Sequence, residues 1–505
     1  MELSAHNKVE TPVSGVREHK IVALLCLLAA IHVFIFAAAF PFFNNVDEAA
    51  HFDLLVKYSH GQVPQGLEQF SGESSAHLGV FASGEYWIKK ETLPPGKVML
   101  PPWKQTAENV HQAVENNVAT WQTHNNYEGS MPPLYYAMGG LWWNIGQWLG
   151  FEKGGLLYWL RFLNILVMAT LIWVSYVAAR LIFPENIFLR LGVPALLAVV
   201  PQTEFYSLGN DVVSALSYGL VFVCLVKWVG AKTPSGRLGA ATGFAFAATY
   251  LAKMTNIPLL GVALATISLK TIQSVRTGEK LGEKLPALMA FLGGGAPPII
   301  AWMLWCKFHF GDLTGSSMKM NFFGWTVKPL GEWLHHPIYS PAGVWAYLCG
   351  QLATYWQGEI VWFFQRMTLP LIDAIYTALS LVLLGAALAG LFSRSNNALQ
   401  RQALWLCFAS FGGILGFFAV MSVVYDFGQC VCPSRDHPYF SAGRMLLGSL
   451  IPFLVLFVYG LDRVLNRWGK SAKFIALLVM ILFMLVFEIA ADRPVFFSLF
   501  NWYHL

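Results

Sequence analysis

The chain has 505 residues, of which 56% are apolar and 12% are charged, with a formal net charge of +5. Soluble domains contain roughly 25% charged residues, so this composition excludes a cytosolic globular enzyme and a disordered chain. The positive excess is small and forms no basic stripe between aromatic residues, so we expect no nucleic-acid partner. Apolar runs of about 20 residues indicate bilayer-spanning helices, whereas a β-barrel would alternate polar and apolar residues. The predicted fold class is an all-α polytopic membrane protein.

The apolar runs predict about 11 transmembrane helices. The first run has no small-residue cleavage site after it, so we expect a retained span rather than a signal peptide. The predicted spans are 21–41, 157–179, 188–207, 211–230, 238–253, 256–270, 286–306, 369–392, 402–425, 443–462 and 474–490.

Two long polar loops, 42–156 and 307–368, lie between these spans. Within the first, 133–149 is short, apolar and rich in Gly, Tyr and Trp, which is typical of a helix at the membrane interface. If 133–149 does not cross, 18 of the 33 Lys and Arg residues fall in short segments on one side of the membrane. The positive-inside rule makes that side cytoplasmic. We therefore expect a cell (inner or plasma) membrane protein with a cytoplasmic N-terminus and both long loops outside, carrying interfacial helices.

The predicted organisation follows from these spans and loops. It comprises a cytoplasmic tail 1–20, a first transmembrane helix 21–41, an extracytoplasmic loop 42–156, a transmembrane core 157–306, a second loop 307–368, C-terminal transmembrane helices 369–490 and an extracytoplasmic tail 491–505.

A group of ionisable residues, Asp47, Glu48 and His51, comes directly after the first span. On a helix, His51 would share a face with both carboxylates. A carboxylate at this place can act as a general base, and a carboxylate–histidine set can hold a divalent cation. The competing interpretation is a helix start, because an Asn or Asp cap followed by an acidic first turn begins many helices.

Three further polar residues lie at the outer ends of predicted spans. Asp211 opens one span, where it could simply cap the helix. Lys253 lies between two apolar runs, a depth at which a lysine must reach the interface or meet an anion. Arg444 opens a late span and could either anchor it in the headgroups or bind a phosphate.

Six short elements occur in a fixed order along the chain. They are Val46-Asp47-Glu48-Ala49-Ala50-His51, Met131-Pro132-Pro133-Leu134-Tyr135-Tyr136, Asn210-Asp211, Lys253-Met254-Thr255, Trp356-Gln357-Gly358-Glu359 and Gly443-Arg444. Together they resemble the GT-C superfamily of membrane glycosyltransferases, which includes the protein O-mannosyltransferases and the bacterial lipid A aminoarabinose transferase. The likeness is greatest to a poorly characterised bacterial branch.

The resemblance implies a GT-C-like architecture and a glycosyltransferase. Such an enzyme moves a sugar from a polyprenyl-phosphate or polyprenyl-diphosphate carrier to a cell-envelope glycan, lipid or protein at the outer face of the membrane. Asp47 would be the catalytic base, with Glu48 beside it. Some members use a divalent cation and others do not, so the cofactor stays open; Glu48, His51 and Asp211 would be its ligands. The residues implied for substrate or donor-phosphate binding are His51, Asp211, Lys253 and Arg444.

Three other functions stay open. A lipid-linked sugar flippase or transporter would place charges in the middle of its spans. A surface-polysaccharide polymerase or ligase would favour Arg and His residues in a late outer loop, where His335-His336 and Arg435-Asp436-His437 occur. A non-catalytic membrane subunit is the third. In the same late loop Cys430 could pair with Cys432 or with Cys349.

Overall fold

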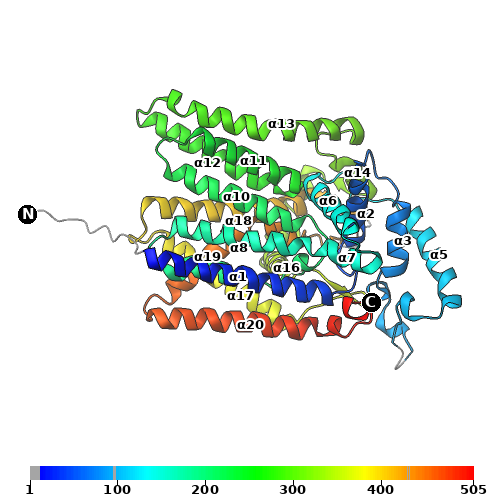
Figure 1. The fold of residues 1–505 in the computed structure, drawn as a ribbon. Helices are drawn as coiled ribbons and strands as arrows, with labels where there is room; N and C mark the ends of the chain where they lie inside the picture. The colour runs from blue at the N-terminus through cyan, green and yellow to red at the C-terminus, as the bar shows by residue number, and fades with distance from the viewer. Residues whose placement is uncertain (1–11, 95–97, 429, 431–432) are drawn as a thin grey trace, which may run out of the picture.

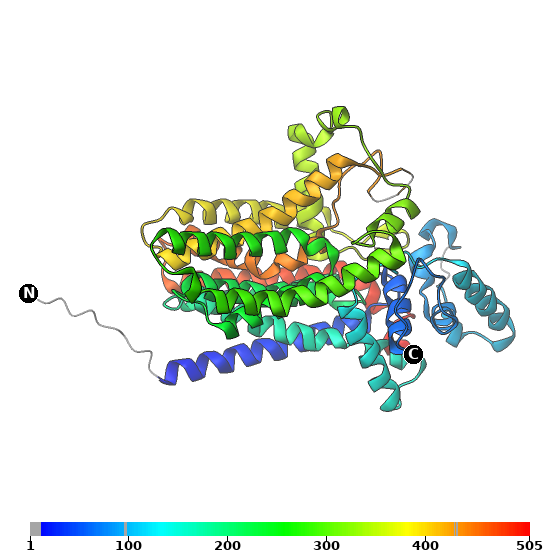
Figure 2. The ribbon, with the colours of Figure 1, turned by 90° about the horizontal axis from the view of Figure 1, so that it is seen from above.

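The computed structural model describes residues 12–94, 98–428, 430 and 433–505. Long helices run side by side in one bundle (Figure 1). Helix α1 (Pro12–Ala39) begins at one end of this bundle, here called the N-terminal end. The C-terminus lies at the other end, where the Tyr503 hydroxyl donates to the carbonyl of Ile35 near the end of α1 (3.3 Å). Both long loops gather at this second end, the loop end (Figures 1 and 2).

Nine helical stretches of the described chain are long and apolar enough to cross a membrane, which confirms the all-α polytopic class. Three of them join consecutive helices: Lys153–Ile182, Met254–Arg276 and Gly443–Val464. The bundle helices after α1 are α7 (Lys153–Arg161), α8 (Leu163–Ile182), α9 (Ile187–Leu197), α10 (Asp211–Gly230), α11 (Gly236–Ala252), α12 (Ile257–Arg276), α13 (Leu285–Phe310), α17 (Pro370–Leu391), α18 (Ala398–Val424), α19 (Leu450–Val464) and α20 (Lys470–Phe496).

Two of the predicted spans, 188–207 and 238–253, correspond to the shorter helices α9 and α11, of 11 and 17 residues. Helix α9 stops early because Pro201 disfavours helical backbone at the residue before it. The chain nevertheless continues to the loop end. Arg190 pairs with Glu18 near the start of α1 (2.5 Å), whereas Asn45, beyond the end of α1, donates to Glu204 (3.0 Å).

The outer loops fold into short helices with little sheet. Strand β1 (Thr326–Val327) pairs antiparallel with β4 (Tyr425–Asp426), and β2 (Val361–Trp362) pairs antiparallel with β3 (Gln365–Arg366). The loop helices are α2 (Glu48–Ser59), α3 (Gly72–Phe81), α4 (Gly84–Trp87), α5 (Ala107–Thr123), α6 (Leu134–Trp148), α14 (Ser316–Phe322), α15 (Leu330–Trp333) and α16 (Pro341–Gln357). Short 3-10 helices at Lys90–Thr92, Pro102–Lys104, Thr203–Tyr206 (η3), Met254–Asn256 (η4), Leu281–Glu283, Pro337–Tyr339, Gly443–Ser449 (η7) and Trp502–His504 complete the order.

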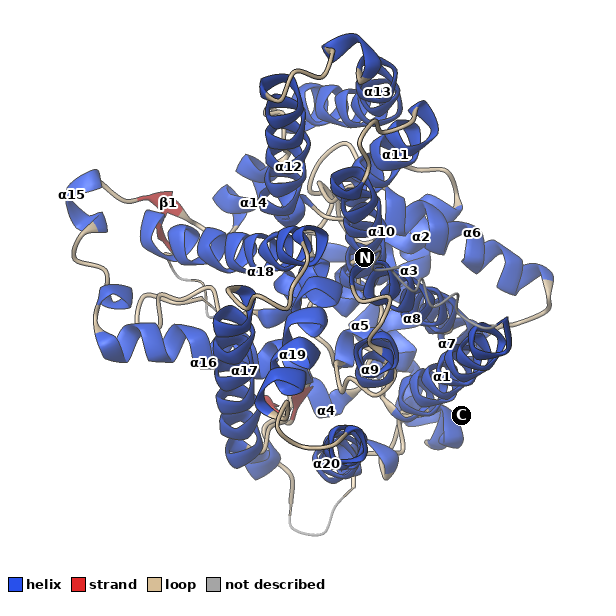
Figure 3. Cartoon of the chain, turned by 90° about the vertical axis from the view of Figure 1, so that its left-hand side faces the viewer, coloured by secondary structure: helices blue, strands red, loops and turns tan. Residues whose placement is uncertain are grey.

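The predicted interfacial stretch 133–149 is helix α6, which is not among the nine candidate spans of the described chain. Figure 3 looks along the bundle and shows α6 from the side, while α10 and α20 are seen end-on. Helix α6 packs on α2, and Asn144 donates to the carbonyl of Ser59 (2.9 Å). Helix α6 therefore lies across the loop end, as an interfacial helix would.

The bundle has an inner and an outer layer. In the most apolar part of the Gly443–Val464 span, 94% of the residues are buried. In that of α20 only 17% are buried, and Ile475, Leu482 and Ile489 are exposed. Helix α20 accordingly stands at the edge of the bundle (Figure 3). The inner position of α19 matters for function, because Arg444 lies in the turn that leads into it.

Cys349, on α16 in the other long outer loop, has a free thiol, so it does not pair with Cys430. Cys432 lies outside the described residues, and a bond between Cys430 and Cys432 stays a prediction.

Candidate active site

Asp47 follows the end of α1 and stands at the N-cap position of α2, as the helix-start interpretation expected. Within the described chain, however, its side chain caps no backbone N–H of α2. Its backbone has a φ of 66°, a left-handed conformation that is strained for a residue other than glycine. The carboxylate instead accepts hydrogen bonds from the Tyr127 hydroxyl (2.7 Å) and from Arg444 Nη2. The local fold therefore directs Asp47 into the bundle end and not along its own helix.

Arg444 is the centre of the cluster and is 5% exposed. Besides Asp47 it pairs with Glu359 (Nε to Oε2, 2.9 Å) and lies 4.0 Å from Asp211 Oδ2. A guanidinium with five donors can serve several carboxylates at once. Among the described residues Asp211 Oδ2 is buried without a hydrogen-bond partner, and the Arg444 Nε–Glu359 Oε2 ion pair, although 2.9 Å long, does not have hydrogen-bond geometry. Such atoms are rare in native interiors and are typical of a site that receives a ligand.

Two glycines bring Arg444 and Glu359 together. A Cβ on Gly443 would lie 2.2 Å from the backbone nitrogen of Tyr355, so η7 can approach the end of α16 only with glycine there. Gly358 has a φ of 78°, and a Cβ there would lie 2.0 Å from Thr203 Oγ1. Gly443 and Gly358 thus allow two close contacts, and the residue after each glycine, Arg444 or Glu359, meets the other.

Lys253 pairs with Asp211 at 2.5 Å and is 5% exposed. Lys253 follows α11 and Asp211 begins α10, so this ion pair closes the loop end between two helices. Lys253 therefore meets an anion of the protein itself, which is the second of the two possibilities that its position in the sequence left open. The same holds for Arg444, which is buried among carboxylates and does not anchor its helix in the headgroups.

Glu48 lies apart from this cluster although it adjoins Asp47 in sequence. Arg161 Nε and Nη2 donate to its two oxygens (2.8 and 2.9 Å). The backbone N–H groups of Phe43 and Leu208 donate to the same two oxygens (2.8 and 3.0 Å). With every oxygen engaged, Glu48 joins α1, α7 and the segment before α10, which is a positioning role and not the catalytic one expected.

His51 Nδ1 lies 2.8 Å from the Tyr136 hydroxyl, and the imidazole is buried. Burial, assisted by Arg444 and Lys253, lowers the pKa of His51 to about 3, so the ring is neutral at physiological pH. Tyr135, the neighbouring residue, accepts a hydrogen bond from the N–H of Gly209 (3.1 Å). The Tyr135-Tyr136 element therefore reaches the Asp47 cluster from α6 and orients two of its components.

Charges around Asp47 set its protonation. Burial alone would raise the pKa of Asp47, but Arg444, Lys319 and His51 hold it below the ordinary value of 3.8. Glu204 behaves in the opposite way. Burial and the nearby Asp211 raise the pKa of Glu204 to about 8, although Arg444 opposes this. At neutral pH the cluster thus combines an ionised carboxylate at Asp47 with a protonated carboxyl group at Glu204.

Sequence reasoning missed four members of the site: Tyr127, Lys319, Glu204 and Glu359. Lys319 arrives on α14 from the second loop and pairs with Glu128 at 2.6 Å. Burial raises the pKa of Glu128, and Lys319 opposes it. Glu359 belongs to an element that the sequence comparison singled out, but Lys319 lies in no such element.

The expected metal ligands Glu48, His51 and Asp211 do not form a metal site. Glu48 is held by Arg161, Asp211 by Lys253, and the described residues contain no group of three His, Cys, Asp or Glu side chains suited to a metal ion. The residues present therefore do not fit the expected cation.

The Arg and His residues of the late outer loop are held by their own surroundings. His336 Nε2 donates to the carbonyl of Pro438 (3.1 Å), and Arg435 pairs with Asp426 at the surface (2.9 Å). The first contact joins the loop 307–368 to the loop after α18, and the second lies within the loop after α18.

Residues 30–426 match the family described as "Predicted membrane protein (DUF2142)". The chain belongs to the DUF2142 family. No curated protein is significantly similar to this DUF2142 chain.

Two crystal structures of the Archaeoglobus fulgidus oligosaccharyltransferase are similar to parts of this DUF2142 protein. The complex with Zn and sulfate has 14% identity and a TM-score of 0.32, with 73% of this chain and 44% of the archaeal chain covered. The apo form has 10% identity and a TM-score of 0.36, with 93% and 55% covered. The DUF2142 chain thus spans about half of the archaeal enzyme, and TM-scores this low do not establish a common fold.

Proposed function

We propose that this DUF2142 protein is an integral-membrane glycosyltransferase. It takes a sugar from a polyprenyl-phosphate or polyprenyl-diphosphate carrier and transfers it to a cell-envelope glycan, lipid or protein at the outer face of the cell membrane. The observation that carries the proposal is the strained, ionised Asp47 beside the buried Arg444. In this orientation the N-terminal end is cytoplasmic and the loop end faces outward.

The two side chains match the two demands of the reaction. The acceptor hydroxyl attacks C1 of the sugar, its C–O bond forms as the bond from C1 to the carrier phosphate breaks, and the phosphate leaves with the bonding electron pair. Asp47 accepts the hydroxyl proton, and Arg444 and Lys253 neutralise the negative charge that grows on the phosphate. Attack from the side opposite the phosphate inverts C1.

The donor itself would raise the basicity of Asp47. Before the donor binds, Arg444 holds the pKa of Asp47 low, and a carboxylate with a low pKa is a weak base. A phosphate that draws Arg444 toward itself weakens this ion pair, so the pKa of Asp47 rises when the base is needed. Arg444 Nε, which contacts Glu359 without hydrogen-bond geometry, is the donor group from which this exchange would begin.

A second function is favoured by a buried group of ionisable residues on two bundle helices. His32 on α1 lies 2.8 Å from Glu488 on α20, the Tyr206 hydroxyl donates to Glu488, and Asp492 lies nearby. Ionisable groups inside spans often mark ion or proton pathways. Their presence supports a lipid-linked sugar transporter as the alternative.

Reconstituted vesicles separate the two functions. We expect the purified protein to release free polyprenyl phosphate and a glycosylated product when a synthetic polyprenyl-phosphate sugar and an acceptor are supplied on the loop-end side, as measured by mass spectrometry. Movement of intact donor between leaflets, with no product, would contradict the proposal and favour the transporter. A surface-polysaccharide polymerase or ligase would instead require His336 and Arg435, and we expect transfer to survive substitution of both.

A further inference from the structure

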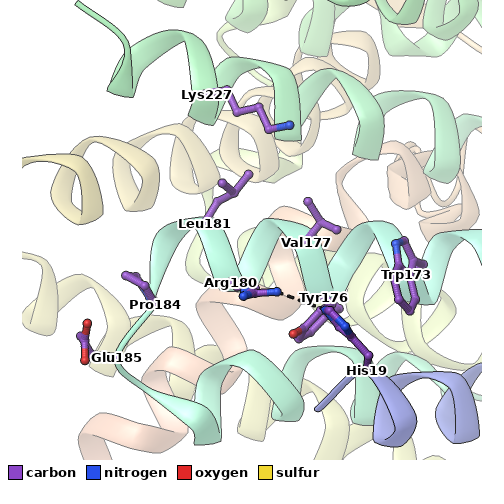
Figure 4. A pocket seen from close by; sticks show the side chains of 9 residues that line it. All are labelled: His19, Trp173, Tyr176, Val177, Arg180, Leu181, Pro184, Glu185 and Lys227. Atoms are coloured by element: carbon purple, nitrogen blue, oxygen red, sulfur yellow. Dashed lines mark hydrogen bonds between the residues drawn. The ribbon is translucent and has the colours of Figure 1, made fainter. Parts of the chain in front are cut away.

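A pocket of about 460 Å³ lies at the N-terminal end of the bundle, away from the Asp47 cluster. This volume is within the range of roughly 300–1,000 Å³ that ligand sites occupy. Figure 4 shows that its side chains come from three helices, α1, α8 and α10, and from the loop after α8. The lining residues are His19, Trp173, Tyr176, Val177, Arg180, Leu181, Pro184, Glu185 and Lys227.

The polar and apolar walls of this pocket follow one another along α8. Arg180 lies in the last turn of α8, at the bundle end, with Leu181 beside it. Trp173 lies seven residues earlier, which is roughly 10 Å deeper along the helix, and its side chain is 42% exposed. Val177 lies between them (Figure 4). A charged mouth above an apolar wall is the profile of a single lipid molecule.

The mouth of the pocket is cationic. Lys227 reaches in from α10 and Arg180 from α8, and Glu185 is the single carboxylate among the lining residues. Arg180 Nη1 lies 3.2 Å from His19 Nε2, and since arginine has only donors, the imidazole nitrogen is the acceptor of this contact. With His19 counted as neutral, the formal charge of the lining residues is +1, which suits an anion.

Aromatic contacts hold the wall in place. The His19 ring lies 5.8 Å from Trp173 and 5.9 Å from Tyr176, and the Tyr176 hydroxyl donates to Glu18 (3.2 Å). Glu18 in turn pairs with Arg190 (2.5 Å). The side of the pocket next to α1 is therefore held by a buried network. Lys227, on α10 at the opposite side of the pocket, is exposed.

We infer that this pocket binds an anionic phospholipid of the leaflet at the N-terminal end of the bundle. The phosphodiester accepts hydrogen bonds from Lys227 and Arg180, and an acyl chain lies along Val177 and Trp173. Free phosphate would leave the apolar wall uncovered. The polyprenyl-phosphate donor is needed at the opposite end of the bundle. The inference does not depend on the transferase activity proposed above.

Native mass spectrometry of the full-length protein in detergent tests this assignment. Dioleoyl phosphatidylglycerol and dioleoyl phosphatidylcholine differ in charge but have identical chains, and we expect the first to bind preferentially. Lys227→Ala should weaken binding of phosphatidylglycerol about fivefold, because a basic residue near an anionic lipid contributes about a factor of this size. Lys232→Ala is the matched control, since Lys232 is an exposed lysine after α10 that does not line the pocket.

Three results would overturn the assignment. The first is equal binding of the two phospholipids by the wild-type protein, and the second is equal loss in Lys227→Ala and Lys232→Ala. The third is tighter binding of a polyprenyl phosphate than of phosphatidylglycerol, with the same dependence on Lys227. Displacement of phosphatidylglycerol by millimolar inorganic phosphate would likewise show that the apolar wall adds nothing. Trp173→Ala, which keeps both cations, is expected to reduce binding of the lipid and not of inorganic phosphate.

Discussion

The side chains of two consecutive residues, Asp47 and Glu48, lie in two different ion-pair regions of the loop end. Glu48 has a side chain that is 0% exposed and receives four hydrogen bonds, two of them from Arg161. Asp47 has a side chain that is 18% exposed and pairs with an arginine that also serves two other carboxylates. Both pairs are carboxylate–guanidinium contacts, yet one is saturated and the other still has unused donors and acceptors.

The contrast separates a structural ion pair from a reactive one. A buried pair with every partner in place has nothing to gain from a ligand, and its loss leaves an uncompensated charge. The Arg444 region has an unsatisfied carboxylate oxygen at Asp211 and an ion pair with Glu359 that lacks hydrogen-bond geometry, together with backbone strain at Asp47. A ligand hydroxyl can donate to these carboxylates, and phosphate oxygens can accept hydrogen bonds from Arg444.

Glu48→Gln should disrupt the fully hydrogen-bonded ion pair with Arg161 and have the largest effect on stability. It leaves the Arg161 charge buried without its carboxylate, and such a loss costs about 3–5 kcal/mol. We expect a large fall in Tm, followed by intrinsic fluorescence in detergent, and a matching loss of folded protein. A fully stable Glu48→Gln would show that Arg161 does not depend on this partner.

Lys253→Gln should affect the reactive region and change mainly donor use. A hydrogen bond to a charged group contributes about 1.5–3 kcal/mol, so kcat/KM for the donor should fall about 10- to 100-fold. Steady-state rates at varied donor concentration measure this, with Lys307→Gln, an exposed lysine at the end of α13, as the control. An unchanged kcat/KM for the donor would place Lys253 outside the phosphate site.

Glu204 should make stability depend on pH. Its pKa is about 8 in the folded protein against an ordinary value of 4.5, so the folded state binds more protons between these values and stability falls as pH rises. His51, with a folded pKa of about 3 and an ordinary value of 6.5, has the opposite effect, but only below about pH 6.5.

Between pH 6.5 and 8 we therefore expect the Tm of the wild-type protein to fall, and that of Glu204→Gln to fall less. Thermal unfolding across this range measures the difference. Parallel curves for the two proteins would contradict a raised pKa at Glu204.

Tyr127→Phe should have the smallest effect. It removes one hydrogen bond to Asp47 and leaves Arg444 in place. Because the donor is neutral and Arg444 still pairs with Asp47, the loss should lie at the low end of the about 1.5–3 kcal/mol that a hydrogen bond to a charged group contributes, so transfer should slow roughly tenfold with Tm nearly unchanged. A loss as large as that of Asp47→Asn would mean that the tyrosine itself reacts.

The sequence predicted the members of the site that lie at span boundaries. Asp47, Asp211, Lys253 and Arg444 all follow or open apolar runs on one side of the membrane, so the topology alone places them at the same end. Their direct pairing could not be predicted, because the order of helices around the bundle is not written in hydropathy.

What the sequence could not predict depends on long-range partners. Glu48 and Asp47 are adjacent, and only the position of Arg161, 113 residues away, distinguishes their roles. Lys319 and Glu204 reach the cluster only through the tertiary fold, because the segments around them have no helical sequence period that would place them. The same is true of the break after α9, where an apolar run continues although the helix stops.

The most direct test of the account is the turnover of Asp47→Asn with a synthetic polyprenyl-phosphate sugar. Asparagine keeps the shape of the side chain but cannot take the proton, and loss of a general base costs about 10²–10⁴ in rate. Arg444 retains Glu359 and Asp211 as partners, so the Tm should stay close to that of the wild-type protein. Asp436→Asn, the same change at an exposed acid of the outer loop, should leave the rate unaltered. Near-wild-type turnover by a folded Asp47→Asn would contradict the assignment of Asp47 as the base.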